Sequence, residues 1–340
     1  MPSWDGVNAW TLSDDGKLFY SSHGGASGGN GPALQLAWVT RTGEVGVVDP
    51  AWTFTRGTDE GQSLSLSPDG SVVALREFAQ GGYDIYLNEL DTGVRRRLTF
   101  DEAHDKMPIW EPGGENITFL SDRNGDFDVW SRAANGTGQS ELLLDAEGDL
   151  ERVEWSPDGE WLLLWTVSDD ILSFRPRQDS VAMPLFAGES EKMDPAISPD
   201  GRWIAYVSRE TGTNQMYVQP FPDVGGAKYQ VSTIDARLPR WAHNGRELFY
   251  QDSGREPRTW VVEFDATDDV FRFGTPTLLF DAPQGWTGSG RYAEPYEVAP
   301  DDERFLIPVE VAPGGAEGPV APPFVLVNNF AEVLKRMVPN

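Results

Sequence analysis

Short strand-like runs recur along the chain, each bounded by glycine, proline, asparagine or aspartate. In one of them, Arg152-Val153-Glu154-Trp155 leads into a tight turn and then into the apolar run 161–165. Runs of four to six residues with such boundaries predict β-strands. A helical period persists for three turns only in the segment NNFAEVLKRM. The pattern therefore predicts an all-β chain with one short C-terminal helix, over residues 329–337.

The tight turn repeats at a regular interval. Its last residue is, in order along the chain, Gly16, Gly70, Gly114, Gly159, Gly201, Gly245 and Asp302. The middle intervals are about 44 residues long, which suits a four-stranded antiparallel propeller blade. Since one blade cannot bury both of its faces alone, the blades must be arranged radially around a channel.

Seven turns predict a seven-bladed β-propeller, with six blades as the alternative if the first or last unit is a partial extension. We expect one propeller domain over residues 1–340. Its repeat units are expected at about 4–50, 62–100, 106–146, 151–188, 193–233, 237–283 and 292–330.

The recurring turn sequence Ser-Pro-Asp-Gly has a conformational basis. Proline presets φ, aspartate bonds nearby backbone amides, and glycine accepts a positive φ, so that the second strand folds back on the first. We interpret these residues as structural turn residues and not as an active-site signature. The full Pro-Asp-Gly pattern occupies Pro68-Asp69-Gly70, Pro157-Asp158-Gly159 and Pro199-Asp200-Gly201. Alternate residues of the preceding strand, such as Val153 and Trp155, are expected to pack blade against blade.

Charge and composition exclude several classes of function. The chain has 54 acidic and 27 basic residues, a formal net charge of −27. Such a surface repels phosphate backbones and anionic lipids, which argues against nucleic-acid binding. The absence of cysteine excludes disulfides, thiolate metal sites and cysteine nucleophiles. No apolar run is long enough to span a membrane, and the start MPSWDGVNAW lacks the basic and apolar regions of a signal peptide.

Several segments resemble known propellers. The segment DPAISPDGRWIAYVSRETGTNQMYVQPFP, Asp194 to Pro222, resembles the PD40, or WD40-like, repeat of TolB-type β-propellers. The segments LAWVTRTGEV, RWAHNGRELFYQD, GTPTLLFDAP and FVLVNNFAEVLKRMVP are similar to the propeller that follows a bacterial serine/threonine kinase and its membrane helix. This resemblance implies a periplasmic or otherwise extracytoplasmic sensor that binds a ligand or a protein. The kinase signatures and the membrane helix are absent from the sequence, so kinase activity is not implied, and a cytoplasmic location stays open.

The sequence contains no catalytic constellation. Ser27, in the Gly-rich loop GASGG, matches the nucleophile-elbow pattern but lacks the strand before it and the helix after it. His23, His104 and His243 fall in different units without metal-ligand spacing, so no metal site is assigned. His243 stands where other turns have proline, and we expect it to be exposed.

Two acidic patterns fit turns and loops better than ligand sites. The residues Asp122, Asn124, Asp126 and Asp128 alternate oxygen ligands, but the glycine and glutamate positions of an EF-hand do not fit. A hairpin turn at Asn124-Gly125 is the preferred interpretation, and Ca²⁺ is the minor alternative. The pairs Asp169-Asp170 and Asp268-Asp269 are expected to be solvated loop tips.

The best functional signal is a set of basic residues just ahead of the inner strands: Lys106, Arg152, Lys192 and Arg237. Gathered around one channel mouth, they would attract a small anionic ligand or an acidic protein segment. The alternative is ordinary ion pairing with the neighbouring acids Asp105, Glu151, Glu191 and Asp235.

We therefore expect a monomeric, non-catalytic TolB-like binding module without a cofactor. The alternatives are a lactonase- or lyase-like propeller enzyme with a central divalent cation, and the accessory propeller of a prolyl-oligopeptidase-type peptidase.

Overall fold

A computed structural model describes residues 7–12, 18–22, 33–55, 63–79, 82–186, 190–252, 254, 256–266, 270–286, 296–311 and 324–327. The regular elements in these ranges are β-strands, as the sequence predicts. Nothing in the described ranges forms a helix of the length and apolarity that crossing a membrane requires. The C-terminal helix expected over 329–337 lies outside the described residues.

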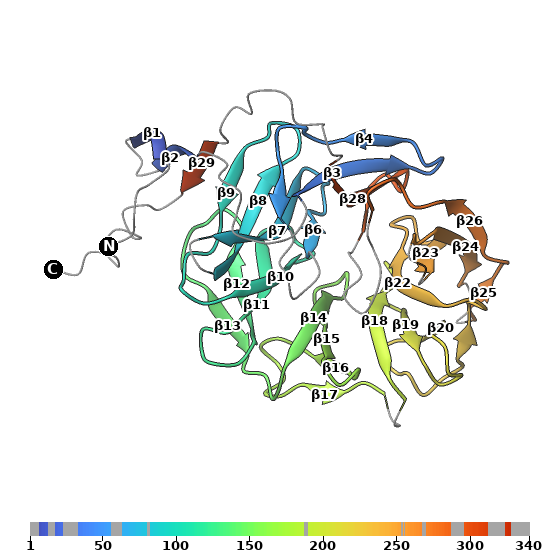
Figure 1. Cartoon of the computed structure of the whole chain (residues 1–340). Helices are drawn as coiled ribbons and strands as arrows, with labels where there is room; N and C mark the ends of the chain where they lie inside the picture. Colours follow the sequence, from blue (N-terminus) through green and yellow to red (C-terminus); the bar gives the residue numbers. More distant parts are fainter. Residues whose placement is uncertain are drawn as a thin grey trace.

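Six antiparallel blades built on four strands surround a central axis in this part of the chain (Figure 1). The first blade contains β6 (Leu64–Leu66), β7 (Val72–Ala79), β8 (Gly82–Glu89) and β9 (Arg95–Arg97). The second contains β10 (Asp105–Trp110), β11 (Asn116–Ser121), β12 (Asp128–Ala133) and β13 (Glu141–Leu144). The third contains β14 (Leu150–Trp155), β15 (Leu162–Thr166), β16 (Ile171–Phe174) and β17 (Met183–Pro184).

The other three blades continue around the ring. The fourth contains β18 (Lys192–Ile197), β19 (Trp203–Ser208), β20 (Gln215–Pro220) and β21 (Tyr229–Gln230). The fifth contains β22 (Ala236–Trp241), β23 (Glu247–Asp252) and β24 (Thr259–Asp265), and both β25 (Arg272–Phe273) and β26 (Thr277–Phe280) pair with β24. The sixth contains β27 (Glu297–Val298), β28 (Arg304–Glu310), β3 (Ala33–Thr40) and β4 (Val45–Val47), with β5 (Phe54–Thr55) also paired to β3.

The sixth blade corrects the prediction of seven blades, and the alternative of six is right. Its two inner strands come from the end of the chain and its two outer strands from the beginning, so the unit expected at 4–50 is not a blade. Strand β3 pairs with β28 from Thr40↔Arg304 to Leu34↔Glu310 and thereby closes the ring.

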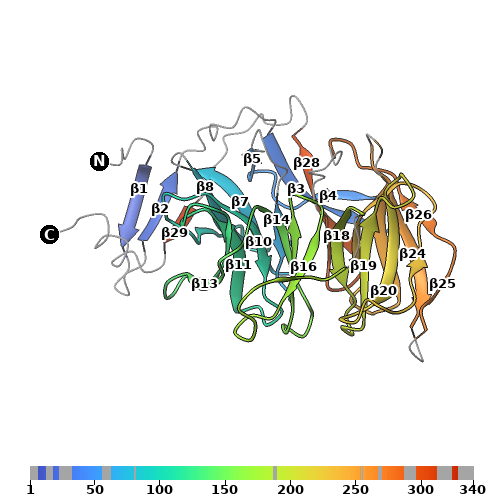
Figure 2. The same cartoon turned by 90° about the horizontal axis from the view of Figure 1, so that it is seen from below.

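The remaining N-terminal strands form an extension. Strands β1 (Val7–Leu12), β2 (Leu18–Ser22) and β29 (Phe324–Val327) join the first blade through the parallel pair β29–β9. Figures 1 and 2 show them outside the ring, beside that blade. The two strands that flank Gly16 in the sequence, β1 and β2, therefore pair in this outer extension and not at the axis. The turn-like sequence at Gly16 misled the blade count because any tight hairpin uses the same turn residues.

The Pro-Asp-Gly turns join the first and second strands of their blades. In the first blade, Asp69 Oδ1 accepts hydrogen bonds from Ser67 Oγ at 2.6 Å and from Ser71 N at 3.0 Å. Gly70 has a φ of 74°, a left-handed conformation that favours glycine. A Cβ there would also lie 2.9 Å from Cδ of Pro300 in the sixth blade, so glycine lets these two turns approach.

Tryptophans of the inner strands bind to the preceding blade, as the sequence predicts for Trp155. Its Nε1 donates to Thr118 Oγ1 on β11 at 3.0 Å, and Trp241 Nε1 donates to the carbonyl of Ala196 on β18 at the same distance. Leu120, Val129, Val153 and Leu164 share one buried cluster between the second and third blades. These contacts fix the inner strands around the axis.

Candidate functional site

The inner strands enclose an axial cavity of about 380 Å³ that opens between the first turns of the blades. Five turn prolines and one histidine line it: Pro68, Pro112, Pro157, Pro199, Pro300 and His243. We call these six residues the collar. The collar is largely apolar, because five of the six turns place a proline at the same position.

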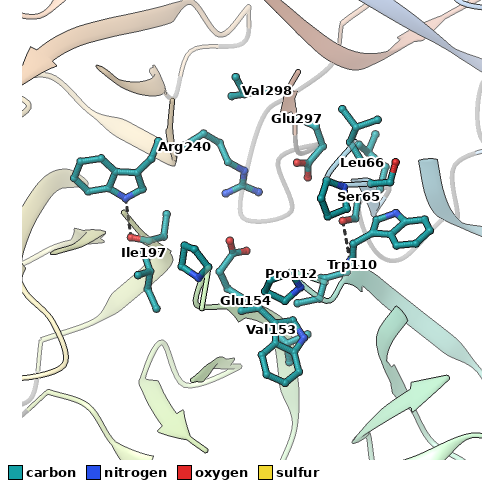
Figure 3. A pocket seen from close by; sticks show the side chains of 18 of the residues that line it. Ser65, Leu66, Trp110, Pro112, Val153, Glu154, Ile197, Arg240, Glu297 and Val298 are labelled. Carbon is teal, nitrogen blue, oxygen red and sulfur yellow. Dashed lines mark hydrogen bonds between the residues drawn. The ribbon is translucent and has the colours of Figure 1, made fainter. Parts of the chain in front are cut away.

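The third residue before each collar residue also lines the cavity, and we call these the axial residues. They are Ser65, Ile109, Glu154, Ala196, Arg240 and Glu297. Three of the six are charged, although they come from the most enclosed strands of the fold. Figure 3 shows Glu154, Arg240 and Glu297 pointing from three blades towards one space.

These three side chains are not used to hold the blades together. Within the described residues, the carboxylates of Glu154 and Glu297 make no hydrogen bond or ion pair, and Arg240 donates only to the carbonyl of Pro239, at 3.1 Å. Unpaired charges in an enclosed site cost folding free energy, so a cluster of this kind points to a binding role.

Burial dominates the electrostatics of the cavity. It raises the pKa of Glu297 to about 7, against the attraction of Arg240, and the charge of Glu154 adds to the rise. The pKa of Glu154 is also raised, again by burial, while Arg240 and Arg152 oppose the shift. Burial would lower the pKa of Arg240, but Glu297 and Glu154 outweigh it and raise that pKa. At neutral pH Arg240 therefore keeps its positive charge, whereas ionising both Glu154 and Glu297 in the cavity costs free energy.

A short, buried ion pair between Asp194 and Arg237 lies beside the axial residues. Asp194 Oδ2 on β18 accepts from Arg237 Nε at 2.7 Å and from the amide of Leu238 at 3.2 Å, both on β22. Burial alone would raise the pKa of Asp194, but Arg237 and Arg152 hold it below its usual value. Asp194 thus ties the fourth blade to the fifth.

Bulges in the inner strands place the residues that make this contact between the fourth and fifth blades. Met107, Asp194 and Leu238 have positive φ values of 51–52°, each directly before a proline and at a register shift in the pairing of the first two strands. An extra residue at a bulge bends a strand and redirects its side chains. The bulges therefore turn residues such as Asp194 towards the neighbouring blade.

The four basic residues predicted to surround the channel mouth do not form one ring, although two of them share a partner. Arg152 lines the cavity, and its Nη1 lies 4.0 Å from Oδ1 of Asp194, which Arg237 also contacts. Lys106 Nζ lies 3.7 Å from the ring centre of Phe127, and Lys192 Nζ donates to the carbonyl of Ser190 at 2.9 Å. Lys106 and Arg237 stand eight residues before their turn glycine, Arg152 seven and Lys192 nine, so they do not share one position. Their role in binding stays a prediction.

The other candidate residues have structural surroundings or lie outside the described residues. His243 is half exposed, and its Nδ1 lies 3.0 Å from Oδ1 of Asp302. In the predicted oxygen-rich turn, Asp128 accepts from Asn124 Nδ2 at 3.1 Å and from the amide of Ala146 at 3.0 Å. In the portion of the chain that the structure describes, no three His, Asp or Glu side chains gather around a metal position. His23, Ser27 and the pair 268–269 lie outside that portion.

Asp169 corrects the expectation of a solvated tip. It is 6% exposed in the β15–β16 turn, where its carbonyl accepts the amide of Lys192 from the next blade at 2.7 Å. Its charge also helps to raise the pKa of Arg237 on β22 of the fifth blade. Asp170, beside it, is exposed.

Glu154, Arg240 and Glu297 were not among the site residues predicted from the sequence. Their signal was present: at the axial position the six units read Ser, Ile, Glu, Ala, Arg and Glu, between residues that pack blade against blade. A charged residue at an enclosed strand position, aligned across repeats, was the pattern to follow.

Comparison with known proteins agrees with the propeller fold. Residues 58–181 match the family model of the TolB beta propeller domain. A Tol-Pal system protein TolB of Francisella tularensis is 30% identical over 62% of this chain and 45% of its own length. An uncharacterized protein of Agrobacterium fabrum is 29% identical over 42% of this chain and 52% of its own length. The chain thus spans about half the length of these curated relatives.

Solved structures show the same fold. A structure assigned as TolB from Agrobacterium tumefaciens has a TM-score of 0.63 at 20% identity, covering 84% of this chain and all of that one. One assigned as a 6-phosphogluconolactonase from Bacteroides uniformis has a TM-score of 0.50 at 16% identity, covering 87% and 85%. At these identities the likeness concerns the fold alone.

Proposed function

We propose that this six-bladed propeller, which is similar to TolB propellers, is a non-catalytic binding module whose axial cavity receives a ligand or a segment of a partner protein. The observation that carries the proposal is the set of three charged axial residues, Glu154, Arg240 and Glu297, which face one space without pairing among themselves. Enclosed pockets with a few convergent polar groups are the usual form of binding sites.

The collar gives this site an apolar entrance. An incoming group would pass the prolines before its polar part reaches the axial residues, so shape and charge would both select it. By resemblance to the kinase-linked propellers, we propose that the module works outside the cytoplasm as a sensor or interaction domain of an envelope or signalling protein. The match to a named Tol-Pal component supports a role in assembly with other proteins.

The test compares two variants with equal charge changes. Glu154→Gln/Arg240→Gln/Glu297→Gln neutralises the cavity, whereas Glu141→Gln/Glu160→Gln/Arg177→Gln neutralises exposed residues. Immobilised wild type and both variants would be incubated with an envelope extract of the source bacterium, and the retained proteins and small molecules quantified by mass spectrometry. We expect a retained species that is lost by at least 10-fold in the cavity variant and kept by the surface variant.

Enzymatic alternatives would give other results. A stoichiometric divalent cation in the purified protein, together with lactone or ester turnover lost in the cavity variant, would replace the proposal by the lactonase-like alternative. Equal retention by all three proteins would place binding outside the cavity and contradict the proposal.

A further inference from the structure

The axial cavity presents charges of both signs around one small space. Glu154 on β14 and Glu297 on β27 supply carboxylates, and Arg240 on β22 supplies a guanidinium (Figure 3). Arg152 on β14 also lines the cavity, so two acids and two arginines face it. A ligand with charge of one sign would satisfy half of these groups and be repelled by the other half.

Near the arginines of the cavity, two buried polar atoms make no hydrogen bond with any described residue. Arg152 Nη1 is buried and has no hydrogen-bond partner within the described residues, and the same holds for Oδ1 of Asp194, 4.0 Å away. Buried polar atoms normally have partners, and this ion pair is too long for a hydrogen bond, so Arg152 retains a donor that the carboxylate of a bound ligand could accept. The nearby Asp194–Arg237 pair, closed at 2.7 Å, shows what a purely structural ion pair looks like in this fold.

The volume of the cavity limits the size of the ligand. A cavity of about 380 Å³ lies at the small end of the range of roughly 300–1,000 Å³ that is usual for small-molecule sites. Apolar collar residues such as Pro157 and Pro199 surround its entrance, where an aliphatic part of a ligand could pack.

We infer that the axial cavity binds a small zwitterion, with an ammonium and a carboxylate on one short carbon skeleton, as in a free amino acid or a dipeptide. The ammonium lies between Glu154 and Glu297, and the carboxylate lies on the side of Arg240 and Arg152. The collar then surrounds the side chain. This inference rests on the proposed function and names the ligand class of the same cavity.

The test uses the whole chain and titration calorimetry. The twenty free amino acids and a set of dipeptides are titrated singly, and each one that binds is compared with its N-acetyl derivative and its C-terminal amide. We expect at least one zwitterion to bind. Both derivatives, each of which has lost one charge, should bind at least 10-fold more weakly.

Variants locate the site. Glu154→Gln/Glu297→Gln should weaken the zwitterion at least 10-fold, whereas the exposed pair Glu141→Gln/Glu160→Gln should leave its affinity unchanged. Circular dichroism and thermal unfolding would establish that each variant is folded.

Three outcomes would overturn the inference: no zwitterion binds, the derivatives bind equally well, or binding survives in the cavity variant. A purely cationic probe such as putrescine or Ca²⁺ that binds through Glu154 and Glu297, where no zwitterion does, would overturn the ligand class and leave the proposed function standing. If the envelope-extract experiment also shows no dependence on the cavity, the proposed function fails as well.

Discussion

A single carboxylate on the axis shows how the site and the stability of the fold oppose each other. Glu297 sits on a two-residue strand between the buried residues Tyr296 and Val298, where an apolar side chain would cost nothing to enclose. Burial raises its pKa to about 7, which means that ionising it in the folded protein is unfavourable. Charged residues at such positions are retained for function at the expense of stability.

The cost of ionising Glu297 predicts how the stability of the protein changes with pH. The folded protein holds the Glu297 proton up to about pH 7, whereas the unfolded chain releases it near its ordinary pKa of 4.5. Between these values the folded state binds more protons, so its free energy of unfolding falls as pH rises. We expect Glu297→Gln to remove this loss and to be more stable than wild type at pH 8 by roughly 1–3 kcal/mol. Chemical denaturation at pH 4.5 and pH 8 measures the difference.

The exposed substitution Glu160→Gln is the control and should follow the wild-type pH dependence. A Glu297→Gln protein that is less stable than wild type at pH 8 would show that the carboxylate stabilises the fold, which contradicts its assignment to ligand binding.

At the scale of elements, the turns of the fifth and sixth blades depart from the Ser-Pro-Asp-Gly pattern together. His243 replaces proline and therefore has an amide, which donates to Oδ1 of Asp302 at 2.7 Å. The amide of Asn244 donates to Oδ2 of the same carboxylate at 2.9 Å. Asp302 occupies the glycine position with a φ of 60°, a left-handed conformation that is costly for aspartate. The two departures thus compensate each other across a blade boundary.

A double-mutant cycle tests this compensation. Asp302→Gly alone relieves the backbone but leaves two amides without their acceptor, and we expect it to lower the free energy of unfolding by about 1 kcal/mol. In a His243→Pro/Asn244→Asp background, which restores the common turn, we expect the same change to raise it by about 0.5–1 kcal/mol. The measurement is the unfolding midpoint in denaturant for all four proteins.

The coupling should therefore be about 1.5–2 kcal/mol, within the range found for residues in direct contact. Additive effects would show that the two turns are independent, and that the carboxylate of Asp302 does not offset the cost of its positive φ.

The same elements show what could be predicted from the sequence. Turn chemistry at Gly70, Gly159 and Gly201 located first and second strands correctly, because it acts within a few residues. Whether a hairpin lies at the axis or outside depends on pairing with strands far along the chain, which the sequence around Gly16 does not contain. The charged axial residues could have been found, because each lies between two positions predicted to pack blade against blade, and neighbouring residues of a strand point to different faces.

The whole molecule is a ring that the two ends of the chain close. Strands β3 and β28 pair over their full lengths although more than 260 residues separate Thr40 from Arg304. Buried residues of β3 and β28, including Ala37, Val39, Phe305 and Ile307, share a core cluster with the fifth blade. If this closure opened, the sixth blade would lose its outer half, and Glu297 would lose the support of its blade.

An engineered disulfide measures the contribution of closure. The chain has no cysteine, so the intended bond is the one disulfide that Thr40→Cys/Arg304→Cys can form within a molecule. The two residues are Cα partners in an antiparallel pair, where the expected separation of about 4.5–5.5 Å suits a disulfide. The control is Asn116→Cys/Ala133→Cys within the second blade, which closes a short loop between β11 and β12.

Crosslinking a longer loop removes more entropy from the unfolded chain, about 3 kcal/mol for 15 residues and nearer 5 kcal/mol for the longest loops. We therefore expect the ring-closing disulfide to stabilise the oxidised protein by about 1–2 kcal/mol more than the control does, and reduction to abolish both gains. Unfolding in guanidinium with and without reductant provides the comparison. Equal gains, or failure of the 40–304 bond to form, would contradict closure of the ring by β3 and β28. If the ring-closing disulfide stabilises the protein more than the control does, it should also preserve binding of the axial ligand at higher denaturant concentrations. The reason is that the closed ring holds Glu154, Arg240 and Glu297 around one space.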